Sequence, residues 1–265
     1  MAAPWFEDEI RAACGDVQPG LQVEIADELD STSSELMRRA RDGRLQPTVL
    51  VARRQTAGRG RVGRAWHSGS ADDASSLTFS IGLSMAPRDW SGLSLAAGVS
   101  VAESIDPAKA IGLSLKWPND LWVRDRKLGG ILIETASPQP RQEGRYLIVG
   151  IGINLGPREA ADLRTSPAWL HEWRPDVSPG ELLRTLAVPL LHDLQLFGAR
   201  GFAAFADRYA ERDALLGREV ELSDGSRGVC EGVAWGGELL LRTPQGLKEV
   251  ASGELSVRPR KELPS

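Results

Sequence analysis

Three glycines spaced as G-x-G-x-x-G, beginning at Gly58, interrupt the chain directly after a run rich in β-branched residues at 47–52. The run predicts a buried strand, and the segment behind it holds too much glycine for a helix or a packed strand. A dinucleotide-binding turn has the same glycine spacing, but it requires a helix after the glycines and an acid about 20 residues further along. Residues 65–71 do not favour a helix, and no acid ends the strand expected at 77–83. The context therefore argues against a dinucleotide-binding fold.

The same glycines lie in a stretch of arginines without acids. Residues 43–71 contain no Asp or Glu, and the arginines there are Arg44, Arg53, Arg54, Arg59, Arg61 and Arg64. Backbone N–H groups and guanidinium forks hold phosphate or carboxylate well, so the segment predicts a small-anion site. A solvated arginine loop, or an RNA-binding glycine–arginine stretch, is the alternative for this segment alone. The net charge of −4 argues against a protein that coats nucleic acid by bulk electrostatics.

The composition of the whole chain limits the class of protein and the cellular compartment that we expect. With 265 residues, 42% of them hydrophobic, the chain can bury a core without disulfide or metal support. No apolar run reaches the ~20 residues of a membrane span, and the first ten residues carry acids where a secretory signal would carry bases. Only two cysteines occur, Cys14 and Cys230. We therefore expect a cytoplasmic protein with no zinc framework and no membrane contact.

Periodicity predicts the order of the elements. Helices are expected at 5–13, 93–105, 181–197 and 201–214, and another begins at a Thr32–Glu35 capping box and ends at Gly43. Strands are expected at 22–25, 47–52, 77–83, 113–117, 121–123, 128–135 and 146–154, with a hairpin turn at Asp125-Arg126. Short strands after Gly217 predict a five-stranded barrel-like module. The boundary is expected near Leu215, which gives domains 1–214 and 215–265.

The string Lys116-Trp-Pro-Asn-Asp120 predicts a turn that presents Asn119 and Asp120 at a strand end. An aspartate beside lysines can hold Mg²⁺ on nucleotide phosphates, because this ion keeps most of its waters and takes one or two carboxylates. A plain β-turn explains the same residues equally well in isolation.

Adjacent glycines inside strands form a further pattern. Gly129 and Gly130 follow Lys127, and Gly150-Ile-Gly-Ile-Asn154 repeats the feature on another strand and ends in an amide. Glycine inside a strand indicates a close approach to bare backbone. A small flat ligand lying on both strands would explain the two strings.

Four motifs in series resemble the biotin protein ligase family, over roughly residues 28–262: Thr56-Ala-Gly-Arg-Gly-Arg61, Lys116-Trp-Pro-Asn-Asp120, Arg126-Lys-Leu-Gly-Gly130 and Gly150-Ile-Gly-Ile-Asn154. The resemblance implies an α+β fold, with a mixed-sheet catalytic domain and a C-terminal SH3-like β-barrel. It implies an enzyme that converts biotin and ATP to biotinyl-5′-AMP and passes the biotinyl group to a lysine of the biotin carboxyl carrier protein of acetyl-CoA carboxylase.

The resemblance also implies roles for individual residues. Ser31, Thr32 and Gln55 would bind the ureido ring of biotin, and Lys127 and Arg61 would be catalytic. The implied biotin contacts are completed by Gly58, Arg59, Gly60, Arg61, Lys127, Gly130 and Gly150. The implied ATP contacts are Arg61, Arg64, Trp66, Lys116, Asn119, Asp120, Lys127 and Asn154, with Mg²⁺ at Asp120.

The chain departs from the family pattern in three places. Ser33 stands where the family commonly has Asn, and the stretch 67–76 is longer than usual. Only 29 residues precede Asp30, too few for a helix-turn-helix domain of ~60 residues, so we expect no sequence-specific DNA binding. A lipoate or octanoate ligase remains the nearest alternative enzyme. A nucleic-acid-binding module is disfavoured, because residues 217–257 hold a roughly balanced set of acids and bases.

Overall fold

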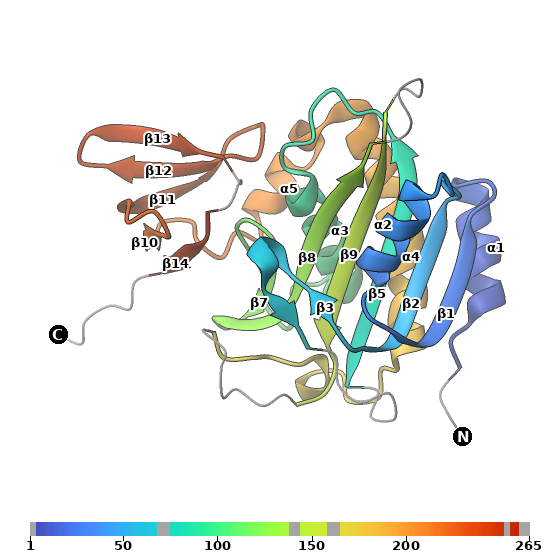
Figure 1. The fold of residues 1–265 in the computed structure, drawn as a ribbon. Coiled ribbons are helices and arrows are strands. Elements are labelled where there is room, and N and C mark those ends of the chain that lie inside the picture. Colours follow the sequence, from blue (N-terminus) through green and yellow to red (C-terminus); the bar gives the residue numbers. More distant parts are fainter. Residues whose placement is uncertain (1–3, 68–74, 138–143, 158–164, 252–254, 260–265) are drawn as a thin grey trace.

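A computed structural model describes residues 4–67, 75–137, 144–157, 165–251 and 255–259. Its centre is a seven-stranded mixed sheet in the order β1-β2-β5-β9-β8-β7-β6 (Figure 1). Only β1 and β2 pair in parallel, and the other neighbours are antiparallel. The strands are β1 (Gln22–Leu29), β2 (Thr48–Gln55), β5 (Ser76–Met85), β6 (Leu113–Lys116), β7 (Asp120–Val123), β8 (Arg126–Ala136) and β9 (Arg145–Asn154). This confirms the predicted α+β class with a mixed sheet.

Helices cover the two faces of the sheet unequally. Helices α1 (Glu7–Val17), α3 (Leu93–Ile105) and α4 (Pro179–Arg200) lie behind it in Figure 1, and α2 (Thr32–Arg41) lies in front. The alternation of strand side chains explains the layers. On β5, Phe79 and Ile81 enter the large core with α3 and α4. Thr78 and Ser80, which point to the opposite face, are buried polar residues. The α2 face is therefore the polar one near the start of β5.

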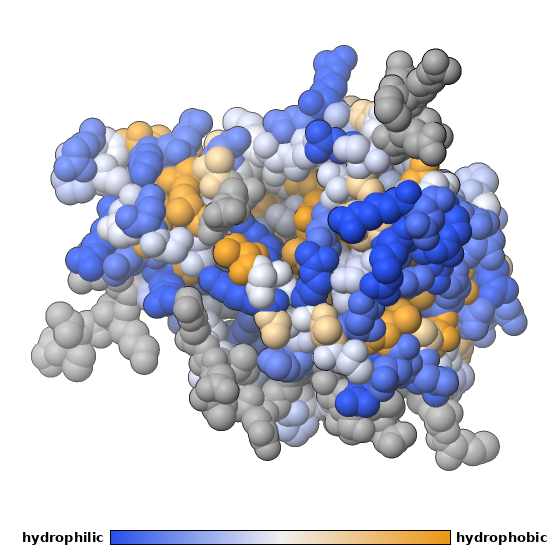
Figure 2. Space-filling model, viewed as in Figure 1, coloured by the Kyte–Doolittle hydropathy of each residue, from blue (hydrophilic) through white to orange (hydrophobic). Residues whose placement is uncertain are grey.

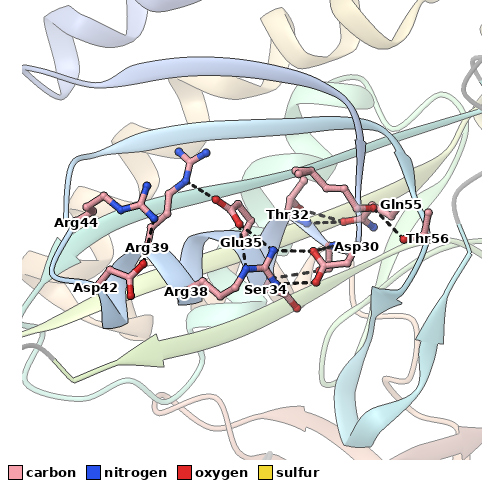
Figure 3. Close-up of polar contacts among 12 residues, drawn as sticks. Asp30, Thr32, Ser34, Glu35, Arg38, Arg39, Asp42, Arg44, Gln55 and Thr56 are labelled. Carbon is pink, nitrogen blue, oxygen red and sulfur yellow. Dashed lines mark hydrogen bonds and ion pairs between the residues drawn. The ribbon is translucent and has the colours of Figure 1, made fainter.

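Charged side chains fix the N-terminal turn of α2 (Figure 3). Ser31 is the N-cap, one residue before the predicted Thr32, and its hydroxyl accepts the N–H of Ser34 at 3.4 Å. The predicted partner of the capping box, Glu35, instead binds Arg38 and Arg39. The capping-box prediction was therefore wrong in its residues, because Ser31 as N-cap makes Ser34, and not Glu35, the third helical residue.

An ion pair also holds Asp30, the residue before the N-cap Ser31, in place. Arg38 donates to both carboxylate oxygens of Asp30, at 2.7 and 2.9 Å, and this hydrogen bonding lowers the pKa of Asp30 from its usual range. Figure 2 shows the hydrophilic surface that these side chains form over α2. The first turn of α2 is thus held in place from outside the sheet.

Most predicted elements differ from the structure by a few residues at their ends, and one turn and one helix require correction. The hairpin turn between β7 and β8 lies at Arg124–Asp125, where both residues have positive φ (51° and 60°), one position earlier than predicted. The helix expected at 201–214 was wrong, because only a helical turn (Phe202–Ala204) and the short α5 (Ala206–Ala210) form. The chain beyond α5 bonds to Leu115 of β6, whose N–H donates to the carbonyl of Arg212 at 2.7 Å. That sheet contact ends the helix.

The C-terminal residues form a second antiparallel sheet, in the order β13-β12-β11-β10-β14. Its strands are β10 (Glu219–Leu222), β11 (Arg227–Val233), β12 (Leu239–Thr243), β13 (Gly246–Val250) and β14 (Val257–Pro259). The five predicted strands are confirmed and fit an SH3-like domain, but β13 and β14 do not pair among the described residues, so no closed barrel is formed there. Cys230 and Leu241 of this sheet pack into the same core as the central sheet. The division at 214/215 stays a prediction.

A buried carboxylate lies where the two sheets meet. Asp213 Oδ1 accepts the N–H of Leu215 at 2.8 Å, whereas Oδ2 is buried and has no hydrogen-bond partner among the described residues. Burial raises the pKa of Asp213 from 3.8 to about 6. Between these two pH values the folded protein holds a proton that the unfolded chain has lost, so this group favours folding at low pH and opposes it as the pH rises.

We therefore expect Asp213→Asn, which can keep the bond to Leu215, to be more stable than the wild type at pH 7.5. The advantage should reach about 1–3 kcal/mol and disappear below pH 4. Urea unfolding of both proteins across this pH range measures it. An advantage that does not change with pH would contradict the assignment of this ionisation to Asp213.

Among the described residues, no helix has the length and apolar character needed to cross a membrane.

Candidate active site

A cavity of about 1220 Å³ opens between the α2 side of the central sheet and the C-terminal sheet. Pockets that hold one drug-sized molecule measure about 300–1,000 Å³, so this space suits two small reactants side by side. All the predicted site residues except Gly58 line it: Ser31, Thr32, Gln55, Arg59, Gly60, Arg61, Arg64, Trp66, Lys116, Asn119, Asp120, Lys127, Gly130, Gly150 and Asn154. Residues separated by more than 100 positions are thus brought to one place.

Hydroxyl groups line one end of the cavity. Gln55, at the end of β2, accepts hydrogen bonds through Oε1 from the backbone N–H of Thr32 at 2.8 Å and from its hydroxyl at 3.2 Å. Ser31 and Thr32 are almost fully buried, with 2% and 3% of their surface exposed. Buried polar groups are costly unless they are bonded, so this end fits a ligand that supplies hydrogen-bonding groups.

Three charged side chains form the centre of the cavity. Lys127 Nζ lies 2.6 Å from Asp120 Oδ1, and Lys116 Nζ lies 3.6 Å from Asp120 Oδ2. Burial alone would raise the pKa of Asp120, but Lys127 and Lys116 outweigh it and hold the pKa below its usual value. Burial lowers the pKa of Lys116, and Asp120 opposes part of that shift. Two lysines thus share one carboxylate, so this centre can accept an anion.

The glycine–arginine segment forms a small hairpin over the cavity. Strand β3 (Gly58–Arg59) pairs with β4 (Ala65–Trp66). A Cβ atom on Gly58 would overlap the carbonyl oxygen of Trp66, so this position requires glycine for the hairpin itself. Arg59 forms an ion pair with Glu134 of β8 at 2.9 Å. Burial lowers the pKa of Arg61, and the charge of Asp120, which lines the same cavity, opposes that shift.

The glycines of β9 are explained by the side chains above them. A Cβ atom on Gly152 would overlap the indole ring of Trp66, and one on Gly150 would lie 2.5 Å from Ser33 Oγ. The sequence analysis singled out Gly150 as a site residue and missed Gly152. Gly152 could have been predicted from the sequence, because it lies two residues after Gly150 and residues two apart on a strand face the same side.

Both predicted amides make structural bonds. Asn154 donates through Nδ2 to the carbonyls of Lys127 and Ala168, at 3.2 and 3.0 Å. Its Oδ1 is buried and has no partner among the described residues. Asn119 donates through Nδ2 to the carbonyl of Ile131 at 2.6 Å. Each amide therefore fixes a strand end, and an ATP contact for either stays a prediction.

The C-terminal sheet contributes residues that the sequence analysis missed. Arg218 donates to both oxygens of Asp125, at 2.6 and 3.0 Å, and so links this sheet to the β7–β8 turn. Arg218, Arg258 and Asp125 line the cavity. No local signal marks this pair, because its members lie 93 positions apart.

The fold and the cavity together define a class: an α+β protein whose glycine-rich sheet surface, beneath an arginine hairpin, forms a cavity suited to anionic small molecules. Comparison with known proteins agrees. The model of the biotin/lipoate A/B protein ligase family matches residues 29–154. The chain is 32% identical over 245 residues to the bifunctional ligase/repressor BirA of Escherichia coli, which covers 90% of this chain and 75% of BirA. It is 35% identical over 181 residues to the biotin–[acetyl-CoA-carboxylase] ligase of Mycobacterium tuberculosis, covering 64% of each.

Solved structures give the same result. A biotin protein ligase from Aquifex aeolicus in complex with biotin and ATP matches with a TM-score of 0.75 and 32% identity, covering 90% of this chain and 99% of that one. The chain therefore belongs to the biotin/lipoate A/B protein ligase family, as a biotin protein ligase. The resemblance of the four motifs is confirmed.

Proposed function

We propose that this protein joins biotin to ATP as biotinyl-5′-AMP and transfers the biotinyl group to a lysine of the biotin carboxyl carrier protein of acetyl-CoA carboxylase. One observation carries the proposal: a buried hydroxyl end and a lysine–aspartate centre share one cavity. The hydroxyl end suits the ureido ring of biotin, and the cationic centre suits its carboxylate together with the phosphates of ATP. A named relative carries out this ligation, and a structural neighbour holds both small molecules.

The chemistry requires charge neutralisation more than a protein nucleophile. A carboxylate oxygen of biotin attacks the α-phosphorus of ATP, and the bond from that phosphorus to the bridging oxygen breaks, releasing pyrophosphate. Because both reactants are anions, positioned cations supply most of the stabilisation. Lys127, Lys116 and Arg61 are the groups proposed for this role. In the second step the acceptor amine attacks the biotinyl carbonyl carbon, loses a proton and displaces AMP.

We propose Mg²⁺ as the cofactor, held by Asp120 and by the phosphates of ATP. The donor set fits, because Mg²⁺ bound to nucleotides commonly uses one or two protein carboxylates. When bound, the ion would neutralise phosphate charge. Among the described residues no cluster of three or more His, Cys, Asp or Glu could form an all-protein metal site. Asp120 would therefore have to exchange a lysine contact for the ion.

The proposal places the protein in the cytoplasm and includes no repressor function. Both cysteines, Cys14 and Cys230, are buried as free thiols, which is usual in a reducing compartment. The net charge of −4 offers no general attraction to DNA. Sequence-selective, nanomolar DNA binding by the purified protein would contradict this part of the proposal.

Pyrophosphate exchange tests the function directly. We expect biotin, and not lipoate, to drive exchange of labelled pyrophosphate into ATP, because an apolar dithiolane ring offers Ser31 and Thr32 none of the hydrogen-bonding groups that a ureido ring supplies. Excess EDTA should stop the exchange and added Mg²⁺ should restore it. Mass spectrometry should detect biotinyl-5′-AMP, and labelled biotin should reach a purified carrier domain only when ATP is present. Exchange driven by lipoate would identify a lipoate ligase instead.

A further inference from the structure

A serine behind the wall of the cavity controls the hydroxyls at its polar end. Ser80, on β5, has none of its surface exposed and does not line the cavity. Its Oγ lies 2.7 Å from Thr32 Oγ1 and 3.0 Å from Ser33 Oγ. Three hydroxyls and the amide of Gln55 thus form one buried chain of hydrogen bonds.

Gln55, the acceptor at the end of this hydrogen-bond chain, decides which hydroxyl donates in each contact. The backbone N–H of Thr32 can only donate, so the Gln55 atom that it meets at 2.8 Å is the amide oxygen. The Thr32 hydroxyl donates its one proton to the same oxygen at 3.2 Å. The short contact between Thr32 and Ser80 therefore requires Ser80 to be the donor. Ser80 then has no proton left for its other contact, so Ser33 is the donor to Ser80.

The direction decides what the cavity offers to a ligand. The Thr32 proton is already bonded, so Thr32 Oγ1 presents only a lone pair. The neighbouring Ser31 accepts the N–H of Ser34 at 3.4 Å and keeps its own proton free to donate. A donor hydroxyl and an acceptor hydroxyl thus lie side by side. A cyclic urea carries the complementary pair, a carbonyl oxygen beside an N–H.

We propose that Ser80 is a positioning residue for ligand specificity: by donating to Thr32, it holds that hydroxyl with its proton on Gln55 and its remaining lone pair toward a ureido N–H of biotin. This inference rests on the proposed function and deepens it. The neighbouring glycine supports it, because a Cβ atom on Gly150 would lie 2.5 Å from Ser33 Oγ and 3.5 Å from Ser80 Oγ. The strand thus leaves room for the hydroxyl chain.

The test uses Ser80→Ala with biotin and two analogues. In each analogue one of the two ureido N–H groups is replaced by an oxygen, which gives a cyclic carbamate. We expect Ser80→Ala to bind biotin about 3- to 10-fold more weakly, the usual effect of one hydrogen bond. The KM for ATP should stay within about twofold of the wild-type value. The preference for biotin over one of the carbamates should fall about tenfold, because a Thr32 hydroxyl that Ser80 no longer holds can leave Gln55 and turn its proton toward the ring oxygen.

Two further variants keep the inference testable. Ser100→Ala removes another buried serine, on α3 and outside the cavity, and should change neither the affinity for biotin nor the selectivity. If Ser80→Ala does not fold, Ser33→Ala removes the donor to Ser80 and should give a smaller loss in the same direction.

The outcomes separate this inference from the proposed function. If the wild type binds biotin while Ser80→Ala binds it within twofold, or keeps the full preference over both carbamates, the role of Ser80 is overturned and the function stands. If the wild type does not bind biotin, the proposed function is overturned, and the role of Ser80 with it. A loss of affinity for biotin and ATP alike would indicate a structural role only.

Discussion

Lys127→Ala is expected to form biotinyl-5′-AMP about ten- to a hundredfold more slowly than the wild type, because a charge-assisted hydrogen bond contributes about 1.5–3 kcal/mol. Lys127 Nζ lies in the cavity, 2.6 Å from Asp120, at the point where two anionic reactants would meet. Its backbone is fixed as well, because its N–H donates to Ser166 and its carbonyl accepts from Ala168, at 2.9 and 2.8 Å. The lost ammonium group cannot be replaced by a small shift of the strand.

Single-turnover formation of the adenylate, at saturating biotin and ATP, measures this effect apart from binding. Lys248→Ala is the matched control. It removes the same charge from an exposed position on β13, where the ammonium contacts Ser226 at 3.2 Å, and should leave the rate unchanged. Adenylate formation by Lys127→Ala at the wild-type rate would show that this lysine does not serve the reaction.

Asp120→Asn is expected to lower both stability and activity, although it keeps the size of the side chain. The two lysines would lose their shared counter-ion in a site where Lys116 has only 8% of its surface exposed. Removing one partner of a buried ion pair costs about 3–5 kcal/mol. Because the Lys127 side chain is 34% exposed, we expect about 2–3 kcal/mol in the free energy of unfolding.

The loss of stability caused by Asp120→Asn should become smaller as the pH rises. Burial already lowers the pKa of Lys116 from 10.5, and without Asp120 this pKa falls further. Between the folded value and 10.5 the unfolded chain holds a proton that the folded protein has lost, so stability rises with pH in that window. The gap between wild type and variant should therefore narrow as the pH is raised from 7 toward 9.5.

Urea unfolding at several pH values tests this, with Asp224→Asn as the control. Asp224 is an exposed aspartate whose ion pair with Lys248 spans 3.8 Å, and its replacement should change stability little. A gap that widens with pH would contradict the role of Lys116. An Asp120→Asn protein with full stability would show that the two lysines need no counter-ion.

Much of the local structure followed from the sequence. The helix at 93–105 was predicted with the bounds that the structure has, because an alanine-rich apolar run satisfies its own backbone within one segment. The helix expected at 181–197 also forms, as α4, and a capping box of Ser178 and Glu181 begins it. The glycine–arginine hairpin was predicted as neither helix nor packed strand, and it forms a short β-hairpin over the cavity.

The sequence was misleading where distant segments compete for the same hydrogen bonds. The helix expected to reach residue 214 ends early because the backbone around Arg212 bonds to β6, about 100 positions earlier in the chain. The Thr32–Glu35 capping box fails because Ser31 is the N-cap, Thr32 bonds to Gln55 of β2, and Glu35 pairs with Arg38 and Arg39. In both cases the local pattern was present, and a stronger partner displaced it.

The sequence by itself determined the family, the succession of most strands along the chain and the residue types available to the site, because these depend on motifs and on spacing along the chain. Only the tertiary structure decided how those residues are used. It bonded the amide of Asn154 to the backbone of Lys127, joined Arg218 to the β7–β8 turn and placed Ser80 behind Thr32. The physical reason is the same in each case. The direction and partner of a hydrogen bond depend on which atoms meet in space, and spacing along the chain does not record that.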